Sequence, residues 1–140
     1  MVYEKSCGFV VYKELQGVRS NLIIRASNGE YGFPKGHVEG GETEYETAAR
    51  ELKEETNVEA KVIDGFRHQI EYNLPYKPNV IKRSVYFLGK CTAESIVCQE
   101  SEVSEAEFVT FETALERLSF EDTKKILKKA DSYISTMVSE

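Results

Sequence analysis

The chain has 140 residues, of which 41% are hydrophobic and 30% are charged, and these proportions predict a single globular domain over residues 1–140. Its 24 acidic side chains outnumber 18 Lys and Arg, so the net charge of −6 disfavours binding to extended nucleic acid or to an anionic membrane. The sequence has no apolar run close to the roughly 20 residues that span a bilayer. Three cysteines, odd in number and without metal-ligand spacing, favour reduced thiols and a cytoplasmic location.

Segments rich in β-branched and aromatic residues predict the strands. They cover residues 6–12, 21–25, 60–73, 80–91 and 107–111. The third and fourth are separated by the turn-rich residues 74–78, so we expect a long hairpin or two strands of one sheet. A last helix is predicted with Ser119 as its N-cap, because apolar residues recur at helical spacing at positions 126, 127, 130, 133, 134 and 137. This order predicts an α+β fold with a mixed β-sheet and two principal helices.

A glycine-rich loop and a further helix are predicted between the second and third strands. Residues 32–41 contain four glycines and one proline, too many for regular structure, so we expect a shaped loop. Thr43 and Glu46 have the spacing of a capping box, which predicts that the helix begins near Glu44. The side chains expected on its buried face are those of Tyr45, Ala48, Ala49 and Leu52.

The same helix carries a cluster of carboxylates. Glu51 and Glu55 are i, i+4 neighbours and repel each other at neutral pH unless a cation lies between them. Glu54 can reach the same cation through water or accept a proton, and Arg50, four residues before it, is placed to orient it. A solvated acidic face is the alternative, but the loop can bring the carbonyl of Gly36 to the same cation. Carboxylate oxygens without His or Cys favour Mg²⁺, with Mn²⁺ as a second choice.

The 23 residues from Gly36 to Val58 resemble the Nudix box, a loop–helix signature. The matching positions are Gly36, Glu42, Arg50, Glu51, Leu52, Glu54 and Glu55. Asn57 stands where the family usually has glycine, and asparagine is the next-best residue for a left-handed C-cap. The resemblance implies an α/β/α sandwich, a nucleoside diphosphate derivative as substrate, and divalent ions held by Glu51, Glu54 and Glu55. It also implies that the general base is Glu54 or a glutamate on a later loop.

Outside this motif, the chain is similar to asymmetrical diadenosine tetraphosphate hydrolases. The similarity is carried by residues 33–39 (FPKGHVE) and 7–11 (CGFVV). It implies that Tyr72 stacks on a base, that Lys82 faces the phosphates, and that Glu102 is a metal ligand or the base. Tyr72 could instead be an ordinary sheet aromatic, and Glu102 could belong to a solvated acidic run.

Four further candidates follow from the chemistry of the residues themselves. Lys35, in a glycine-rich loop beside the acidic helix, is suited to bind a phosphate. His37 could bind phosphate or fix the loop. Tyr76, which lies between two prolines and beside Lys77, suits a platform for an adenine ring, although it could be an ordinary loop aromatic.

The expected activity is metal-dependent hydrolysis of diadenosine tetraphosphate to ATP and AMP, by a protein that is a monomer or a weak homodimer. One alternative is a Nudix hydrolase of other nucleotide derivatives, including RNA 5′ ends, or of diphosphoinositol polyphosphates. Another is a non-catalytic nucleotide-sensing module. The intact set of Glu51, Glu54 and Glu55 argues against the last alternative, because a binder does not need all three.

Overall fold

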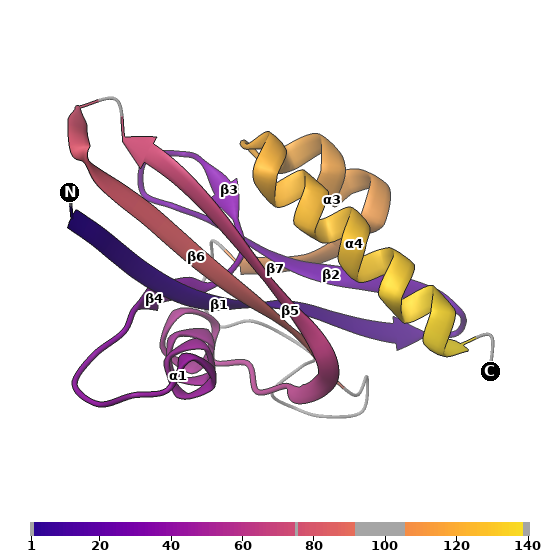
Figure 1. Cartoon of the computed structure of the whole chain (residues 1–140). Coiled ribbons are helices and arrows are strands. Elements are labelled where there is room, and N and C mark those ends of the chain that lie inside the picture. The colour runs from indigo at the N-terminus through magenta and orange to yellow at the C-terminus, as the bar shows by residue number, and fades with distance from the viewer. Residues whose placement is uncertain (1, 75, 92–105, 139–140) are drawn as a thin grey trace.

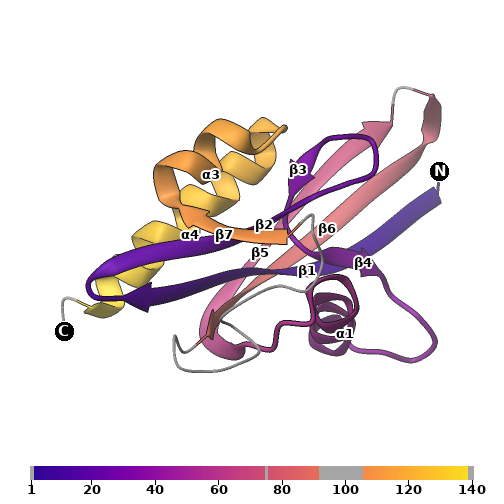
Figure 2. The same cartoon turned by 180° about the vertical axis from the view of Figure 1, so that it is seen from behind.

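The computed structural model describes residues 2–74, 76–91 and 106–138, and this part of the chain forms one sheet with helices on both faces (Figures 1 and 2). The strands are β1 Val2–Leu15, β2 Val18–Arg25, β3 Tyr31–Gly32, β4 Lys35–His37, β5 Lys61–Leu74, β6 Lys77–Cys91 and β7 Ala106–Thr110. The helices are α1 Glu44–Thr56 on one face, and α3 Phe111–Arg117 and α4 Glu121–Val138 on the other. The predicted fold class is confirmed, with α3 as a short additional helix.

The sheet is mixed because β1 and β6 run parallel. Their register begins with Val2 opposite Val80 and ends with Lys13 opposite Cys91. The other pairs are antiparallel, including the predicted β5–β6 hairpin. The tip of this hairpin and the start of β1 project beyond α3 and α4 in both views, so these helices cover only part of their face of the sheet.

Side-chain alternation along the strands divides the core in two. On β6, Tyr86 and Leu88 pack with residues of α4, whereas Val85 and Phe87 pack with residues of α1. The predicted apolar stripe of α4 is confirmed, since four of its six positions are almost completely buried. Ser84, two residues before Tyr86, therefore faces the α4 side of the sheet.

Both ends of α1 follow the sequence prediction. The Thr43 hydroxyl accepts a hydrogen bond from the Glu46 N–H at 3.1 Å, and the Thr43 N–H donates to the Glu46 carboxylate at 2.8 Å. Asn57 ends the helix in the left-handed conformation with a φ of 61°. Of the expected buried face, Ala48 and Leu52 are inside the core. The capping box and the asparagine C-cap thus set the limits of this helix.

Tyr45 and Ser119 depart from the predictions. The Tyr45 side chain is 42% exposed, because its position in the first turn places the ring at the edge of the core, against the edges of Phe9 and Phe87. Ser119 is not the N-cap of α4, which begins at Glu121. Its hydroxyl instead accepts a hydrogen bond from the N–H of Tyr31 at 2.9 Å and joins this segment to β3.

Two further expectations need correction. Residues 32–41 are not irregular throughout, because β4 forms within them by pairing with β1. The cysteines are not all reduced, since Cys7 is buried and free but Cys91 is disulfide-bonded. None of the helices within the described ranges is both long and apolar enough to cross a membrane.

Candidate functional site

The position of β4 depends on a close backbone approach at Gly8. Lys35 pairs with Gly8, and a Cβ atom at Gly8 would lie 2.3 Å from the carbonyl oxygen of Pro34. Only glycine tolerates this contact. The Phe9 N–H donates to the same Pro34 carbonyl at 3.2 Å. Gly8 therefore lets the loop lie directly against β1, which brings Lys35 over the sheet.

A second close approach joins β4 to α1. A Cβ atom at Gly36 would lie 2.1 Å from the carboxyl carbon of Glu51, so the glutamate packs directly on the glycine backbone. The Lys35 N–H, one residue earlier, donates to the carboxylate of Glu55 at 3.3 Å. The structure thus brings Lys35, Gly36, Glu51 and Glu55 together, as the sequence predicts.

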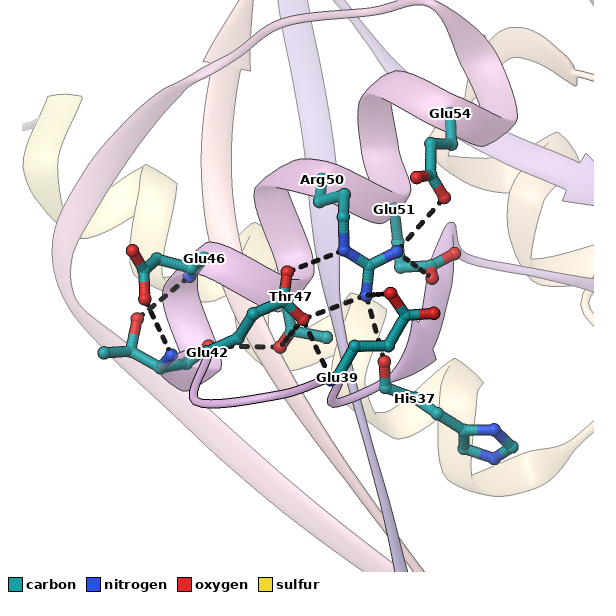
Figure 3. A network of polar contacts seen from close by, with 9 residues as sticks. His37, Glu39, Glu42, Glu46, Thr47, Arg50, Glu51 and Glu54 are labelled. Atoms are coloured by element: carbon teal, nitrogen blue, oxygen red, sulfur yellow. Dashed lines mark hydrogen bonds and ion pairs between the residues drawn. The ribbon is translucent and has the colours of Figure 1, made fainter.

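Arg50 joins the loop to the acidic helix through a network of ion pairs (Figure 3). It donates to both carboxylate oxygens of Glu42, at 2.7 and 3.0 Å, and to the carbonyl of His37 at 3.1 Å. It also donates to Glu51 at 2.7 Å and, as predicted, to Glu54 at 3.1 Å. Its guanidinium holds the pKa of the Glu42 carboxyl at about 2. This arginine therefore fixes the carboxylates relative to the loop.

The Glu55 carboxyl is a much weaker acid than an ordinary glutamate. Burial raises its pKa to about 7, and the neighbouring Glu51 carboxylate adds to the increase, against the hydrogen bond from the Lys35 N–H. A buried carboxyl beside a second carboxylate is stabilised by a cation or by a proton. The donor set is all oxygen, so the pair of Glu51 and Glu55 fits a hard divalent cation such as Mg²⁺.

The rest of the predicted metal site is not assembled in the part of the chain that the structure describes. No group of three or more Asp, Glu, His or Cys side chains there is arranged to hold a metal ion. The Glu54 side chain is 59% exposed and turns to Arg50. Glu102, the other predicted ligand or base, lies outside the described residues. Metal binding by these residues remains a prediction.

Lys35 also connects the acidic cluster to the aromatic residues of the hairpin. Its ammonium group donates to the Tyr72 hydroxyl at 3.3 Å and to the Ser84 hydroxyl at 3.2 Å, and it lies 5.6 Å from the centre of the Tyr72 ring. Burial works against the charged form, but Tyr86 and Tyr72 outweigh it, and the pKa of Lys35 lies above its usual value. Lys35 is therefore a fixed cation between the carboxylates and Tyr72.

Lys82 and His37 form a second polar group. Lys82 makes an ion pair with Glu4, and this contact lowers the pKa of Glu4. The Nζ atom of Lys82 lies 3.3 Å from Nε2 of His37, whose ring points away from the Arg50 network in Figure 3. The backbone of His37 thus fixes the loop, while its ring lies with the lysine that is predicted to face the phosphates.

Tyr76 and Lys77 lie apart from these contacts. Tyr76 is 75% exposed at the tip of the β5–β6 hairpin, and Lys77 is the first residue of β6. Their predicted contact with an adenine ring is untested. A cavity of about 500 Å³ beside the start of α1 contains none of the predicted site residues; it is lined by Tyr45, Val62, Ile63, Asp64, Gly65, Phe66, Arg67 and Phe87.

Three residues of the site are absent from the sequence prediction. Ser84 and Tyr86 could have been found from Lys82, because alternate residues of a strand share a face. Glu4 could not, because it meets Lys82 through the parallel pairing of β1 with β6, where the two residues are direct partners. No local pattern in the sequence indicates that pairing.

The fold, the glycine-rich loop and the acidic helix with its arginine define the class of the protein. Residues 6–130 match the model of the NUDIX domain, which is most of the chain. The chain belongs to the NUDIX domain family.

Particular relatives match over nearly the whole length. An asymmetrical bis(5′-nucleosyl)-tetraphosphatase of Mus musculus is 29% identical, over 93% of this chain and 95% of the relative. The crystal structure of a C. elegans Ap4A hydrolase is 26% identical, with a TM-score of 0.82 over 96% of this chain and 99% of that chain. Shewanella oneidensis NrtR, at 18% identity and a TM-score of 0.74 over 94% of this chain and 63% of that chain, shares the fold.

Proposed function

We propose that this chain hydrolyses diadenosine tetraphosphate (Ap4A) asymmetrically to ATP and AMP with the help of Mg²⁺. The observation that carries the proposal is the position of Lys35, whose backbone N–H binds the Glu55 carboxylate and whose ammonium group binds the Tyr72 hydroxyl. A phosphate chain that begins at the carboxylates would therefore meet a cation and then an aromatic ring. The names of the relatives from mouse and C. elegans support the same substrate.

The side chains divide the work between binding and chemistry. Tyr72 binds one adenine by stacking, and Lys35 and Lys82 bind phosphate oxygens. In a protein with a net charge of −6, these two lysines and the divalent ion supply the positive charge that a polyanion needs. The second adenosine extends toward Tyr76 at the hairpin tip.

The reaction is an in-line displacement at phosphorus. Water attacks the α-phosphorus of the adenosine nearer to the carboxylates. The bond between this phosphorus and its bridging oxygen breaks, and the oxygen leaves with ATP. Glu54, exposed and held by Arg50, accepts the proton of the attacking water. Glu51 and Glu55, with the carbonyl of Gly36, would hold the divalent ion, which supplies charge neutralisation at the phosphoryl oxygens and a lower pKa for water.

The test is a product analysis with Ap4A and Mg²⁺ in ¹⁸O-labelled water. We expect equal amounts of ATP and AMP, with the label in AMP, and no product in excess chelator. ADP as the only product would mean attack at the centre of the phosphate chain. Label in ATP would mean attack on the other side of the broken bond.

A substrate panel addresses the alternative activities. Efficient release of pyrophosphate from nucleoside triphosphates, or activity on RNA 5′ ends or diphosphoinositol polyphosphates without activity on Ap4A, would replace the proposed substrate. Nucleotide binding without turnover of any panel member would support a sensing module. Full activity in excess chelator would contradict the role of Mg²⁺.

Single substitutions assign the binding roles. Lys35→Ala should act mainly on kcat, since phosphate oxygens gain negative charge in the transition state. Tyr76→Ala should weaken substrate binding by about 1 to 3 kcal/mol, seen as a higher KM, if the second adenine stacks there. An unchanged KM would remove Tyr76 from the site.

A further inference from the structure

Ser84 is a hydroxyl side chain in the interior of the sheet. It is 1% exposed and lies on β6, between Ser6 of β1 and Ile70 of β5. Burial of a hydroxyl costs free energy unless the group is hydrogen-bonded. The ammonium group of Lys35 donates to the Ser84 oxygen at 3.2 Å, and the buried Tyr86 hydroxyl interacts with both groups.

The ammonium group lies between two strands. Tyr72 of β5 and Ser84 of β6 are both acceptors for Lys35, at 3.3 and 3.2 Å. A lysine side chain has a flexible four-carbon stem, and its position is defined only where acceptors hold its end. Acceptors on two neighbouring strands of a hydrogen-bonded sheet fix the ammonium in two directions.

The two acceptors differ in how firmly they are held. Tyr72 is partly exposed on the edge strand, and it is the residue expected to receive a base. Ser84 is completely enclosed and has a short side chain with a single χ angle. Ser84 therefore keeps its place when a substrate moves the Tyr72 ring, as does the buried Tyr86, which also interacts with Lys35.

We propose that Ser84 is a positioning residue, which holds the ammonium group of Lys35 where it meets the phosphate; the inference rests on the proposed function. Ser84 is too deeply buried to contact the substrate, so it acts only through Lys35. Its loss should reduce kcat and leave KM almost unchanged, because a displaced ammonium stabilises the transition state less well.

A matched pair of substitutions isolates the hydroxyl. Threonine and valine have nearly the same shape, but only threonine can accept the hydrogen bond. We expect Ser84→Val and Ser84→Ala to lower kcat about tenfold, with KM within about threefold of the wild type. Ser84→Thr should retain most of the activity. Ser6→Ala is the control. It removes a buried hydroxyl from the neighbouring strand, and this hydroxyl has no hydrogen bond to Lys35 within the described part of the chain.

A double-mutant cycle with Lys35→Met separates positioning from a merely structural role. If Ser84 acts through Lys35, Ser84→Ala has no further effect on kcat in the Lys35→Met background. The same tenfold loss in both backgrounds would overturn the proposal. So would a wild-type kcat for Ser84→Ala in an assay that responds to Lys35→Met.

A measurement without turnover keeps this test separate from that of the proposed function. The ¹H–¹⁵N NMR signal of a lysine ammonium group is sharp when hydrogen bonds hold the group away from solvent exchange. We expect such a signal for Lys35 in the wild type and in Ser84→Thr, and its loss in Ser84→Ala. Failure of the wild type to hydrolyse Ap4A would overturn the substrate assignment, whereas an unchanged Lys35 signal in Ser84→Ala would overturn the role of Ser84.

Discussion

Replacement of Glu55 by glutamine should remove activity and stabilise the metal-free protein. The pKa of Glu55 rises from 4.5 to about 7 because the carboxyl is buried and lies beside Glu51. The folded state therefore holds the Glu55 proton more tightly than the unfolded state does. Above pH 7 the ionised carboxylate opposes folding, and between pH 7 and pH 4.5 this penalty disappears as the carboxyl becomes protonated.

The magnitude follows from the size of the shift. A pKa shift of this size limits the gain in unfolding free energy from Glu55→Gln to about 3 kcal/mol. Because Glu55 is partly exposed to solvent, the expected gain is about 1 to 2 kcal/mol. For a domain of this size, the gain corresponds to a rise in Tm of about 3 to 7 °C at pH 8. Glutamine retains an oxygen that can accept the hydrogen bond from the Lys35 N–H, so the local backbone should not change.

The assay is thermal unfolding of the chelator-treated wild type and Glu55→Gln at pH 8 and pH 4.5. Glu116→Gln, at an exposed position of α3, is the control and should have equal Tm values with the wild type at both pH values. With Mg²⁺, Glu55→Gln should lower kcat about a hundredfold or more, corresponding to about 3 kcal/mol. A Tm gain of the same size at both pH values would refute the reasoning, because the gain would then not arise from the ionised carboxylate.

The remaining predictions concern separate parts of the structure. Gly36→Ala should lower kcat at least about tenfold, since the new Cβ would displace the Glu51 carboxylate. Kinetics at saturating Ap4A would measure this loss, and a kcat equal to that of the wild type would contradict the close contact. Tyr72→Phe should lower kcat several-fold with little change in KM, because it removes a hydrogen-bond acceptor of Lys35. Tyr72→Ala should also raise KM, because it removes the stacking ring. Equal kinetic constants for the two variants would contradict base stacking. The Arg67 ion pair lowers the pKa of Glu44 to about 2, so stability from this pair should be lost as pH falls from about 4.5 to 2, and Tm measurements on Arg67→Ala should show a weaker acid dependence.

The parts of the fold that sequence patterns predicted are those specified by neighbouring residues. The limits of α1 depend on Thr43, Glu46 and Asn57, each of which acts within one helical turn. The β5–β6 hairpin follows from two β-rich segments and the short turn between them. The spacing of Glu51 and Glu55 on a helix likewise predicts their proximity, because a helix fixes the distance between its side chains.

The errors and omissions occur where distant segments decide the outcome. Ser119 has the local chemistry of an N-cap, but the N–H of Tyr31 on β3 competes for its hydroxyl. Tyr45 lies on the apolar side of its helix, but it stays 42% exposed because a cavity separates part of its ring from residues of β5. The contact of Glu4 with Lys82 depends on the parallel register of β1 and β6, which no local periodicity specifies.

Two of the hydrogen bonds of Lys35 have a consequence for the redesign of this protein. Its main chain is bonded to the acidic helix and its ammonium group to Tyr72. If Tyr72 binds the base as proposed, a substitution that changes base preference there also removes a hydrogen bond from the ammonium group proposed to bind the phosphate. Selectivity and rate are therefore coupled at this tyrosine, and a library of Tyr72 variants should yield altered preference mainly at the expense of speed. Tyr76, exposed at the hairpin tip, offers a position where selectivity can be varied with less effect on turnover.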